Sequence, residues 1–279
     1  MSKLKDKKHK EIKRQKKGFL LFGGILVLLV GILVGAVWFS SSYTHSSEQL
    51  TPKAAIIDQL SLTYPNQNMT QEITQCLEDY GFQVDMYQGN DITVNFYDNL
   101  AQKGYNLIII RGHSGSMCSE TDPGRSTGTY LFTTESYSTL KHPMEQLNNE
   151  IVEASVASGQ PSFFAIGPKF ITDSMKGKFN NTVVIIDGCS GLYSQDLANA
   201  FIDKGATAYL AFNAYVYLDY ADGVTLNLIK NLCSGNTTLA KAVGLTMNED
   251  GSDPESNATL KYYPNDIGNL SVRDLTKTK

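Results

Sequence analysis

A run of 22 residues without a charged or strongly polar side chain, Gly18–Phe39, divides this chain of 279 residues into unlike parts. At a rise of about 1.5 Å per residue, a helix over this run spans the roughly 30 Å hydrocarbon core of a bilayer. The run is longer than the apolar core of a cleaved signal peptide, about 7–15 residues, and no small-residue cleavage site stands out after it. We therefore expect a retained transmembrane helix over residues 18–39.

Charge is distributed unevenly on the two sides of this run. Residues 1–17 carry a net charge of +7 and the rest of the chain carries −11. A basic segment directly before a membrane span is typical of the cytoplasmic side. We therefore expect a single-pass protein of the cell membrane, with a cytoplasmic tail at 1–17 and its remaining residues outside the cytoplasm. The acidic remainder has no basic stripe for phosphates, which argues against a nucleic-acid partner.

The part after the run has the composition of a linker followed by one globular domain. Residues 40–50 are short and polar, and we expect them to form the linker. We expect residues 51–272 to form this domain, because they are numerous enough to bury a sizeable core. Residues 273–279 are expected to be a C-terminal tail.

Strands and helices alternate along the domain. Apolar runs predict strands at 54–60, 83–87, 106–111, 182–187 and 206–212, with an edge strand at 260–263. Helical spacing predicts helices at 70–80, 93–103, 194–204, 220–233 and 237–246. This order is typical of an α/β fold with a mostly parallel sheet sandwiched by helices. Residues 116–181 form a long excursion, in which we expect a hairpin around 130–132 and a helix near 145–158.

Glycine-rich turns follow the two most apolar strands. Asn106–Arg111 runs into Gly112-His113-Ser114-Gly115, and Thr182–Asp187 runs into Gly188-Cys189-Ser190-Gly191. Ligands of such sheets bind beyond the carboxyl ends of the strands, so His113 and Cys189 meet in one crevice if the strands are neighbours. The imidazole can take the thiol proton and then protonate a leaving amine. Taken singly, a buried cysteine is usually a small hydrophobe and a histidine after a strand is usually structural.

Backbone amides complete this candidate site. A helix is expected soon after Cys189, and the N–H groups at its start would lower the thiol pKa and stabilise an oxyanion. The expected oxyanion donors are the backbone N–H of Cys189 and that of Ser114 or Gly115.

These two boxes, Gly-His-Ser-Gly and Asp-Gly-Cys-Ser-Gly after apolar strands, resemble the caspase-like cysteine peptidases of the caspase/legumain/gingipain clan. The resemblance is closest to metacaspases and prokaryotic caspase-like domains, and it covers roughly 54–246. The histidine and the cysteine lie 76 residues apart, more than the spacing of about 50 in caspases, and the long excursion accommodates the difference. Ser114 stands where these families usually have glycine.

The resemblance implies a function and a set of site residues. His113 corresponds to the catalytic histidine and Cys189 to the nucleophile. Asp187 corresponds to an acidic pocket residue of metacaspases, which would favour cleavage after Arg or Lys; a helix cap or a satisfied turn carboxylate is the equal alternative. Asn213 falls where loops line the substrate groove, although a surface turn is the simpler interpretation. The chemistry requires no cofactor, while some relatives depend on calcium.

The sequence thus predicts a membrane-anchored cysteine endopeptidase that acts on protein or peptide substrates. The alternative is a catalytically inactive caspase-like surface module that binds proteins, and it is favoured by the serine at 114. Two of the remaining cysteines, Cys76, Cys118 and Cys233, can form a disulfide outside the cell. Their spacing does not predict a zinc site.

Overall fold

The computed structural model of this protein describes residues 51–118 and 126–277. The chain divides into two units between Leu50 and Thr51. The predicted tail, transmembrane helix and linker all belong to the first unit and lie outside the described residues. Within the described ranges, no helix is both long and apolar enough to cross a membrane.

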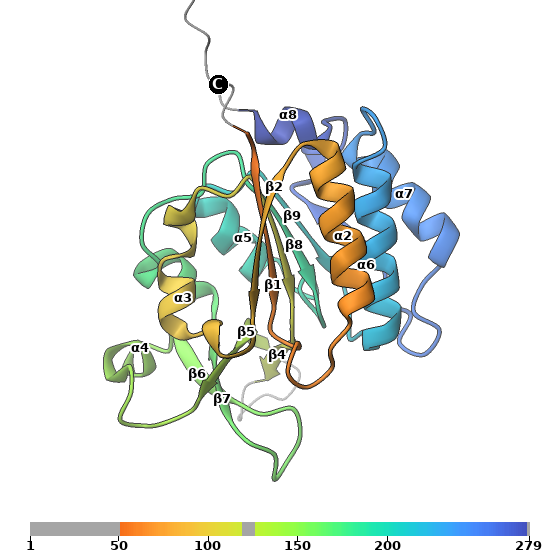
Figure 1. The fold of residues 1–279 in the computed structure, drawn as a ribbon. Coiled ribbons are helices and arrows are strands. Elements are labelled where there is room, and N and C mark those ends of the chain that lie inside the picture. The colour runs from red at the N-terminus through yellow and green to blue at the C-terminus, as the bar shows by residue number, and fades with distance from the viewer. Residues whose placement is uncertain (1–50, 119–125, 278–279) are drawn as a thin grey trace, which may run out of the picture. The chain divides into compact units, whose positions relative to one another are not determined.

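A six-stranded sheet forms the centre of the domain (Figure 1). Its order is β10-β9-β8-β3-β1-β2, and all neighbours pair in parallel except β10, which is antiparallel to β9. The strands are β1 (Lys53–Asp58), β2 (Gln83–Gln88), β3 (Leu107–Arg111), β8 (Val183–Asp187), β9 (Ala208–Phe212) and β10 (Leu260–Tyr263). Every residue of β3, β8 and β9 is buried, as in sheets that are covered on both faces.

Helices cover both faces of this sheet, which confirms the predicted α/β class. One face carries α2 (Gln67–Tyr80), α6 (Leu218–Leu232) and α7 (Leu239–Asp250), and the other carries α3 (Val94–Asp98) and α5 (Asp196–Asp203) (Figure 1). In α2, the buried residues Met69, Ile73 and Leu77 recur at helical spacing and pack in the core under the sheet. Each such side chain contributes roughly 1.5–3 kcal/mol by leaving water.

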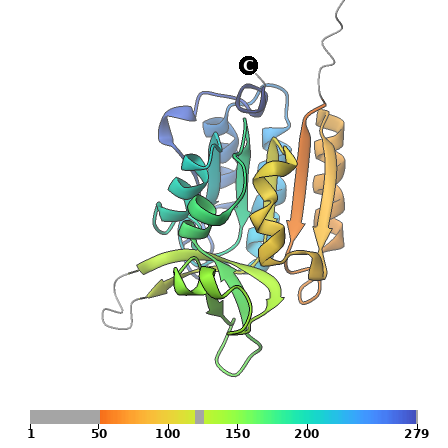
Figure 2. The same ribbon diagram turned by 90° about the vertical axis from the view of Figure 1, so that its left-hand side faces the viewer.

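A second, antiparallel sheet lies beyond the carboxyl edge of the first (Figure 2). It is built from the long excursion in the order β4-β5-β7-β6. The strands are β4 (Ser114–Cys118), β5 (Ser126–Ser136), β6 (Ile151–Ala154) and β7 (Phe163–Ile166), and the short helix α4 (Pro143–Leu147) precedes β6. Residues 130–132, where a hairpin is predicted, lie in β5 and pair with both β4 and β7.

The helix predicted near 145–158 is wrong. Only Pro143–Leu147 is helical, and Asn149 takes a left-handed conformation with φ 57 that ends the helical path. The next residues form β6, in which Ile151 is buried opposite Ile166 of β7. Strand pairing and burial of this β-branched residue outweigh the helical spacing of the segment.

The folded domain extends beyond the predicted boundary at 272. Helix α8 (Val272–Thr276) begins with a capping box between Ser271 and Asp274, and its Leu275 is buried. The predicted tail at 273–279 therefore contains a packed helical turn, because Val272 and Leu275 add apolar surface to the core beside α6 and α7.

Candidate active site

The turns that carry His113 and Cys189 start side by side. Strands β3 and β8 are parallel neighbours, with Arg111 opposite Asp187 at their carboxyl ends. The Gly112 N–H extends this pairing by donating to the Asp187 carbonyl at 3.0 Å. The expectation that these two strands are neighbours is therefore confirmed.

The two turns pack closely against each other beyond the strands. The Ser114 hydroxyl donates to the Cys189 carbonyl at 2.6 Å. A β-carbon on residue 188 would overlap the Gly112 carbonyl oxygen and come within 2.6 Å of the Ser114 Oγ. Glycine is required at 188 because the backbones of the two turns approach this closely.

The His113 side chain lies between two aromatic rings. Its ring is edge-on to Tyr64 at 6.3 Å and to Phe132 at 5.6 Å between centroids. Its backbone N–H donates to the side-chain oxygen of Gln59 at 3.0 Å, which fixes the start of the turn. Burial and then the Arg111 guanidinium lower the pKa of His113 below its ordinary value of 6.5. The imidazole is therefore neutral at neutral pH.

The Cys189 side chain is half-buried and in contact with the loop after β9. Its thiol donates to the Val216 carbonyl at 3.4 Å, and no hydrogen bond joins it to the His113 ring within the described part of the chain. Burial raises the pKa of Cys189 above its ordinary value of 9.0. The thiol is thus protonated at neutral pH.

The turn after Cys189 is held by backbone bonds and is not the start of a helix. Helix α5 begins only at Asp196, so the prediction that helical N–H groups surround the thiol is wrong. Instead, Ser190 takes a left-handed conformation with φ 58, and its N–H donates to the Ala214 carbonyl at 2.8 Å. A non-glycine residue in this conformation is strained and is often found at functional sites.

The hydrogen-bond pattern between β4 and β5 decides whether Ser114 or Gly115 has a backbone N–H available for an oxyanion. Phe132 N–H donates to the His113 carbonyl at 3.0 Å. Hydrogen-bonded pairs alternate along an antiparallel ladder, so Gly115 forms the next such pair with Tyr130. The N–H of Ser114 therefore points away from β5, at the open edge of its sheet, and is the donor that remains for an oxyanion beside the Cys189 N–H.

Asp187 lies in the core under the candidate site, not in a pocket. It is fully buried, and neither of its carboxyl oxygens has a hydrogen-bond partner within the described residues. Burial, reinforced by the neighbouring Asp222, raises the pKa of Asp187 well above its ordinary value, which favours the protonated, neutral form of this group. A fully buried carboxyl group cannot contact the side chain of a substrate Arg or Lys, and the predicted role of Asp187 in substrate binding is therefore not supported.

Asp187 belongs to a row of charged residues that the sequence analysis missed. Arg111 is 1% exposed and donates to Asp58 at 2.8 Å and to both oxygens of Asp222 at 2.7 and 2.8 Å. Asp58, Arg111 and Asp187 end three neighbouring strands in register. A signal was present, because each of these otherwise apolar strands ends in a charged residue of alternating sign.

Replacement of Asp187 by asparagine tests this interpretation. Above about pH 4 the unfolded chain ionises Asp187 while the folded domain keeps it protonated, so the stability from this group is lost as the pH rises through its folded pKa. Asp187→Asn should therefore be at least as stable as the wild type at pH 7 in urea unfolding, and its advantage should shrink towards pH 4.

Asp253→Asn is the matched control for this experiment. Asp253 is also buried, but three backbone N–H groups, of Tyr217, Glu255 and Ser256, bond to its carboxylate. These bonds outweigh burial and lower its pKa, so the control variant should lose stability at pH 7. A loss as large for Asp187→Asn as for the control would contradict a raised pKa of Asp187 in the folded domain.

Asn213 connects two strands of the central sheet, while its predicted place in a substrate groove stays a prediction. Its side-chain oxygen accepts from the Thr259 N–H at 2.8 Å, and its own N–H donates to the Thr259 carbonyl at 3.1 Å. These bonds join the end of β9 to the start of β10, and they account for the polar side chain that was predicted to bind substrate.

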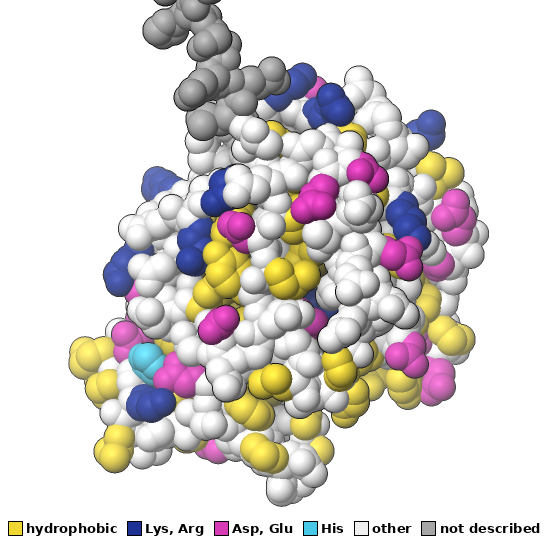
Figure 3. All heavy atoms as spheres, in the orientation of Figure 1, with side chains coloured by type: hydrophobic (Ala, Val, Ile, Leu, Met, Phe, Trp, Pro, Cys, Tyr) yellow, Lys and Arg dark blue, Asp and Glu magenta, His cyan; other side chains and the backbone are white. Residues whose placement is uncertain are grey.

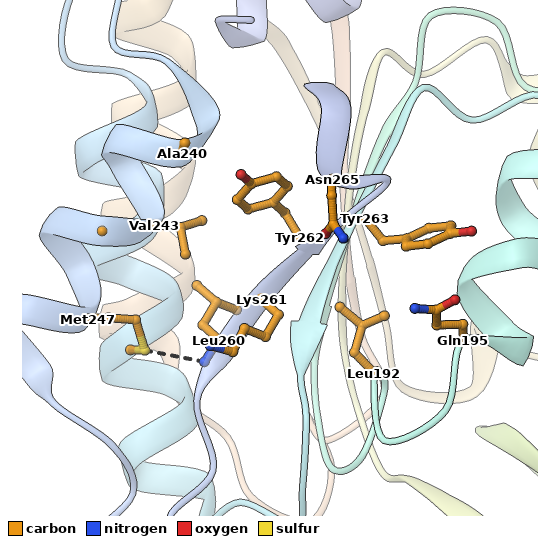
Figure 4. A pocket seen from close by; sticks show the side chains of 11 residues that line it. Leu192, Gln195, Ala240, Val243, Met247, Leu260, Lys261, Tyr262, Tyr263 and Asn265 are labelled. Carbon is orange, nitrogen blue, oxygen red and sulfur yellow. Dashed lines mark hydrogen bonds between the residues drawn. The ribbon is translucent and has the colours of Figure 1, made fainter. Parts of the chain in front are cut away.

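A surface hollow beside β10 does not include the candidate site. It has a volume of about 490 Å³, and Figure 4 shows its side chains on both sides of β10, with Val243 and Met247 from α7 and Leu192 and Gln195 from the segment before α5. Neither His113 nor Cys189 lines it. Within the described residues, no three His, Cys, Asp or Glu side chains are grouped to hold a metal ion.

Comparison with known proteins found no relative of this chain. No protein family matches the chain, and no characterised protein matches its sequence. The candidate site therefore stands on its own residues and on their arrangement.

Proposed function

We propose that the domain is a caspase-like cysteine endopeptidase in which His113 is the general base and acid and Cys189 is the nucleophile. The observation that carries the proposal is the contact between the turns, where Ser114, directly after His113, bonds the backbone of Cys189 at 2.6 Å. Two residue types with matching chemistry follow adjacent strands at the edge where α/β sheets bind ligands.

The reaction begins from a neutral imidazole and a protonated thiol. His113 takes the proton of Cys189 as the sulfur leaves the Val216 carbonyl and attacks the peptide carbonyl carbon. The Cys189 and Ser114 N–H groups stabilise the oxyanion. His113 then gives its proton to the leaving amine, and the thioester is hydrolysed by a water that His113 deprotonates. The cycle needs no cofactor; calcium dependence, known in some families of this resemblance, is tested by adding a chelator.

Exposed aromatic side chains around the two turns support a peptide substrate. Tyr64 lies against the His113 ring, Tyr193 follows the Cys189 turn, and Tyr215 and Tyr217 flank Val216. Their exposed fractions are between 45% and 64%. Figure 3 shows hydrophobic side chains gathered over the lower part of the domain, where the carboxyl edge and the second sheet lie. Such surfaces bind extended chains through apolar contact.

The proposal includes the setting of the enzyme. Residues 18–39 anchor it to the cell membrane as a single span, 1–17 lie in the cytoplasm, and the domain acts outside on protein or peptide substrates. Preference for Arg or Lys is not part of the proposal, because Asp187 is fully buried.

Selective alkylation of the full-length chain tests the function. Cys189 should react with iodoacetamide faster than Cys76 or Cys233, and His113→Ala should remove the difference, because the imidazole is the group that deprotonates the thiol. A panel of fluorogenic peptides with Arg, Lys, Asp, Asn, Leu or Phe before the scissile bond should reveal cleavage that Cys189→Ala abolishes. Equal alkylation of the three thiols together with no cleavage would overturn the proposal.

The pH dependence of cleavage provides a separate test. The active form has a neutral His113, so kcat/KM should rise with pH through an inflection below 6.5 and stay level up to about pH 9, where the thiol still holds its proton. A thiolate–imidazolium pair would instead lose activity as the imidazolium deprotonates. A profile that falls between pH 6.5 and 9 would contradict a general-base mechanism.

One observation favours a second function, a surface module without turnover. The Cys189 thiol bonds to Val216, and its pKa is raised, which disfavours the nucleophilic thiolate. A module of this kind would bind peptides over the exposed tyrosines and would leave them intact. Binding of a panel peptide without cleavage, unchanged in Cys189→Ala, would identify it.

A further inference from the structure

Two cysteines outside the candidate site lie next to each other in the outer helical layer. Cys76 is in α2, and Cys233 directly follows the end of α6, which packs against α2. The Cys76 thiol approaches the Ile229 carbonyl at 3.9 Å, and the Cys233 N–H donates to that same carbonyl at 2.9 Å. Both residues therefore contact the same backbone carbonyl, which places the two cysteines next to each other.

This pair is open to small reagents. Both side chains are half-buried and line a surface hollow of about 610 Å³ together with Asp79, Lys230 and Arg273. Cys189 lies elsewhere, at the carboxyl edge of the sheet, so the pair is separate from the proposed nucleophile.

We propose that Cys76 and Cys233 form a disulfide that joins α2 to α6 when the domain meets an oxidising disulfide such as oxidised glutathione. One thiolate attacks a glutathione sulfur and forms a mixed disulfide, and the first glutathione leaves as a thiol. The second cysteine then attacks the protein sulfur of the mixed disulfide and releases the second glutathione. The two protein thiols lose two electrons and two protons, and the reagent gains them.

The reactivity of the pair agrees with a structural disulfide and not with a second nucleophile. Burial raises the pKa of both thiols, and in Cys76 the contact with Cys233 partly opposes this rise. Isolated attack on a substrate is disfavoured, whereas the position of both cysteines at the Ile229 carbonyl favours a bond between them.

The bond would close a long loop between the two helices. Cross-links over long loops restrict the unfolded chain most, so the melting temperature of the oxidised domain should exceed that of the reduced one by roughly 5–15 °C. The inference is independent of peptidase activity, because neither cysteine lies in the proposed catalytic machinery.

Peptide mapping of the full-length chain tests the inference. The protein is equilibrated with oxidised or reduced glutathione, alkylated under non-reducing conditions and digested. In the oxidised sample the cross-linked peptide should contain Cys76 and Cys233, and Cys189 should remain open to alkylation. Cys76→Ser should restore alkylation of Cys233 and remove the shift in melting temperature. Alkylation of both cysteines in the oxidised wild type, or cross-links to Cys118 or Cys189 in their place, would overturn it.

Discussion

Cys189→Ala is expected to lower kcat/KM for the best peptide of the panel at least about 1000-fold, which corresponds to about 4 kcal/mol of transition-state stabilisation. The reason is that alanine cannot form the thioester. His113→Ala should cause a loss of similar size, because a thiol whose pKa is raised is protonated at neutral pH without a base. The measurement is initial-rate kinetics with the full-length chain.

The double variant and a surface variant complete this experiment. Residues that act as one unit lose activity non-additively, so Cys189→Ala combined with His113→Ala should be no slower than the poorer single variant by more than a few-fold. Cys76→Ala, with a half-buried thiol outside the site, should retain wild-type activity. Residual activity of Cys189→Ala within tenfold of the wild type would exclude Cys189 as the nucleophile.

Arg111→Met should cost about 3–5 kcal/mol of unfolding free energy, and it has the largest expected effect on stability. The guanidinium is almost fully buried and pairs with Asp58 and Asp222, whose carboxylates would remain in the core without a counter-charge. Unfolding in urea, followed by circular dichroism, measures the loss. If the variant does not fold at all, urea will produce no cooperative transition, which is the largest possible loss of stability from the same cause.

A compensated variant separates charge from packing. Arg111→Met combined with Asp58→Asn and Asp222→Asn removes both unpaired charges and keeps the volumes close to the original ones. It should regain part of the stability that Arg111→Met loses, because neutral amides are cheaper to bury than carboxylates. A loss below 1 kcal/mol for Arg111→Met, or no recovery in the compensated variant, would show that the ion network contributes little.

The sequence predicted the central sheet well because its signals are local. Continuous apolar runs such as Leu107–Arg111 and Val183–Asp187 are characteristic of strands covered on both faces, and the structure buries all their residues. The adjacency of the two turns was only a condition of the sequence argument, because a long excursion separates the two strands along the chain, and the structure meets this condition. The turns with His113 and Cys189 are accordingly found at the same edge.

The failures of the sequence analysis concern interactions over long distances. Ile151 forms a strand because it pairs with Ile166, which no local pattern reveals. The burial of Asp187 depends on α6, whose Asp222 lies near it only in the folded chain. Likewise, the Cys189 turn is held by Ala214 and Val216 from the loop after β9, which lie far from it in the sequence.

Arg111 has two roles at once: it holds the domain together through its ion pairs, and it lowers the pKa of His113, the proposed base. Its guanidinium joins β1, β3 and α6, and the same positive charge contributes to the low pKa of His113 two residues later. A molecule that opened at this edge would release the arginine to water and raise the proton affinity of the imidazole. Local unfolding would in this way move the pH dependence of the proposed hydrolysis towards higher pH.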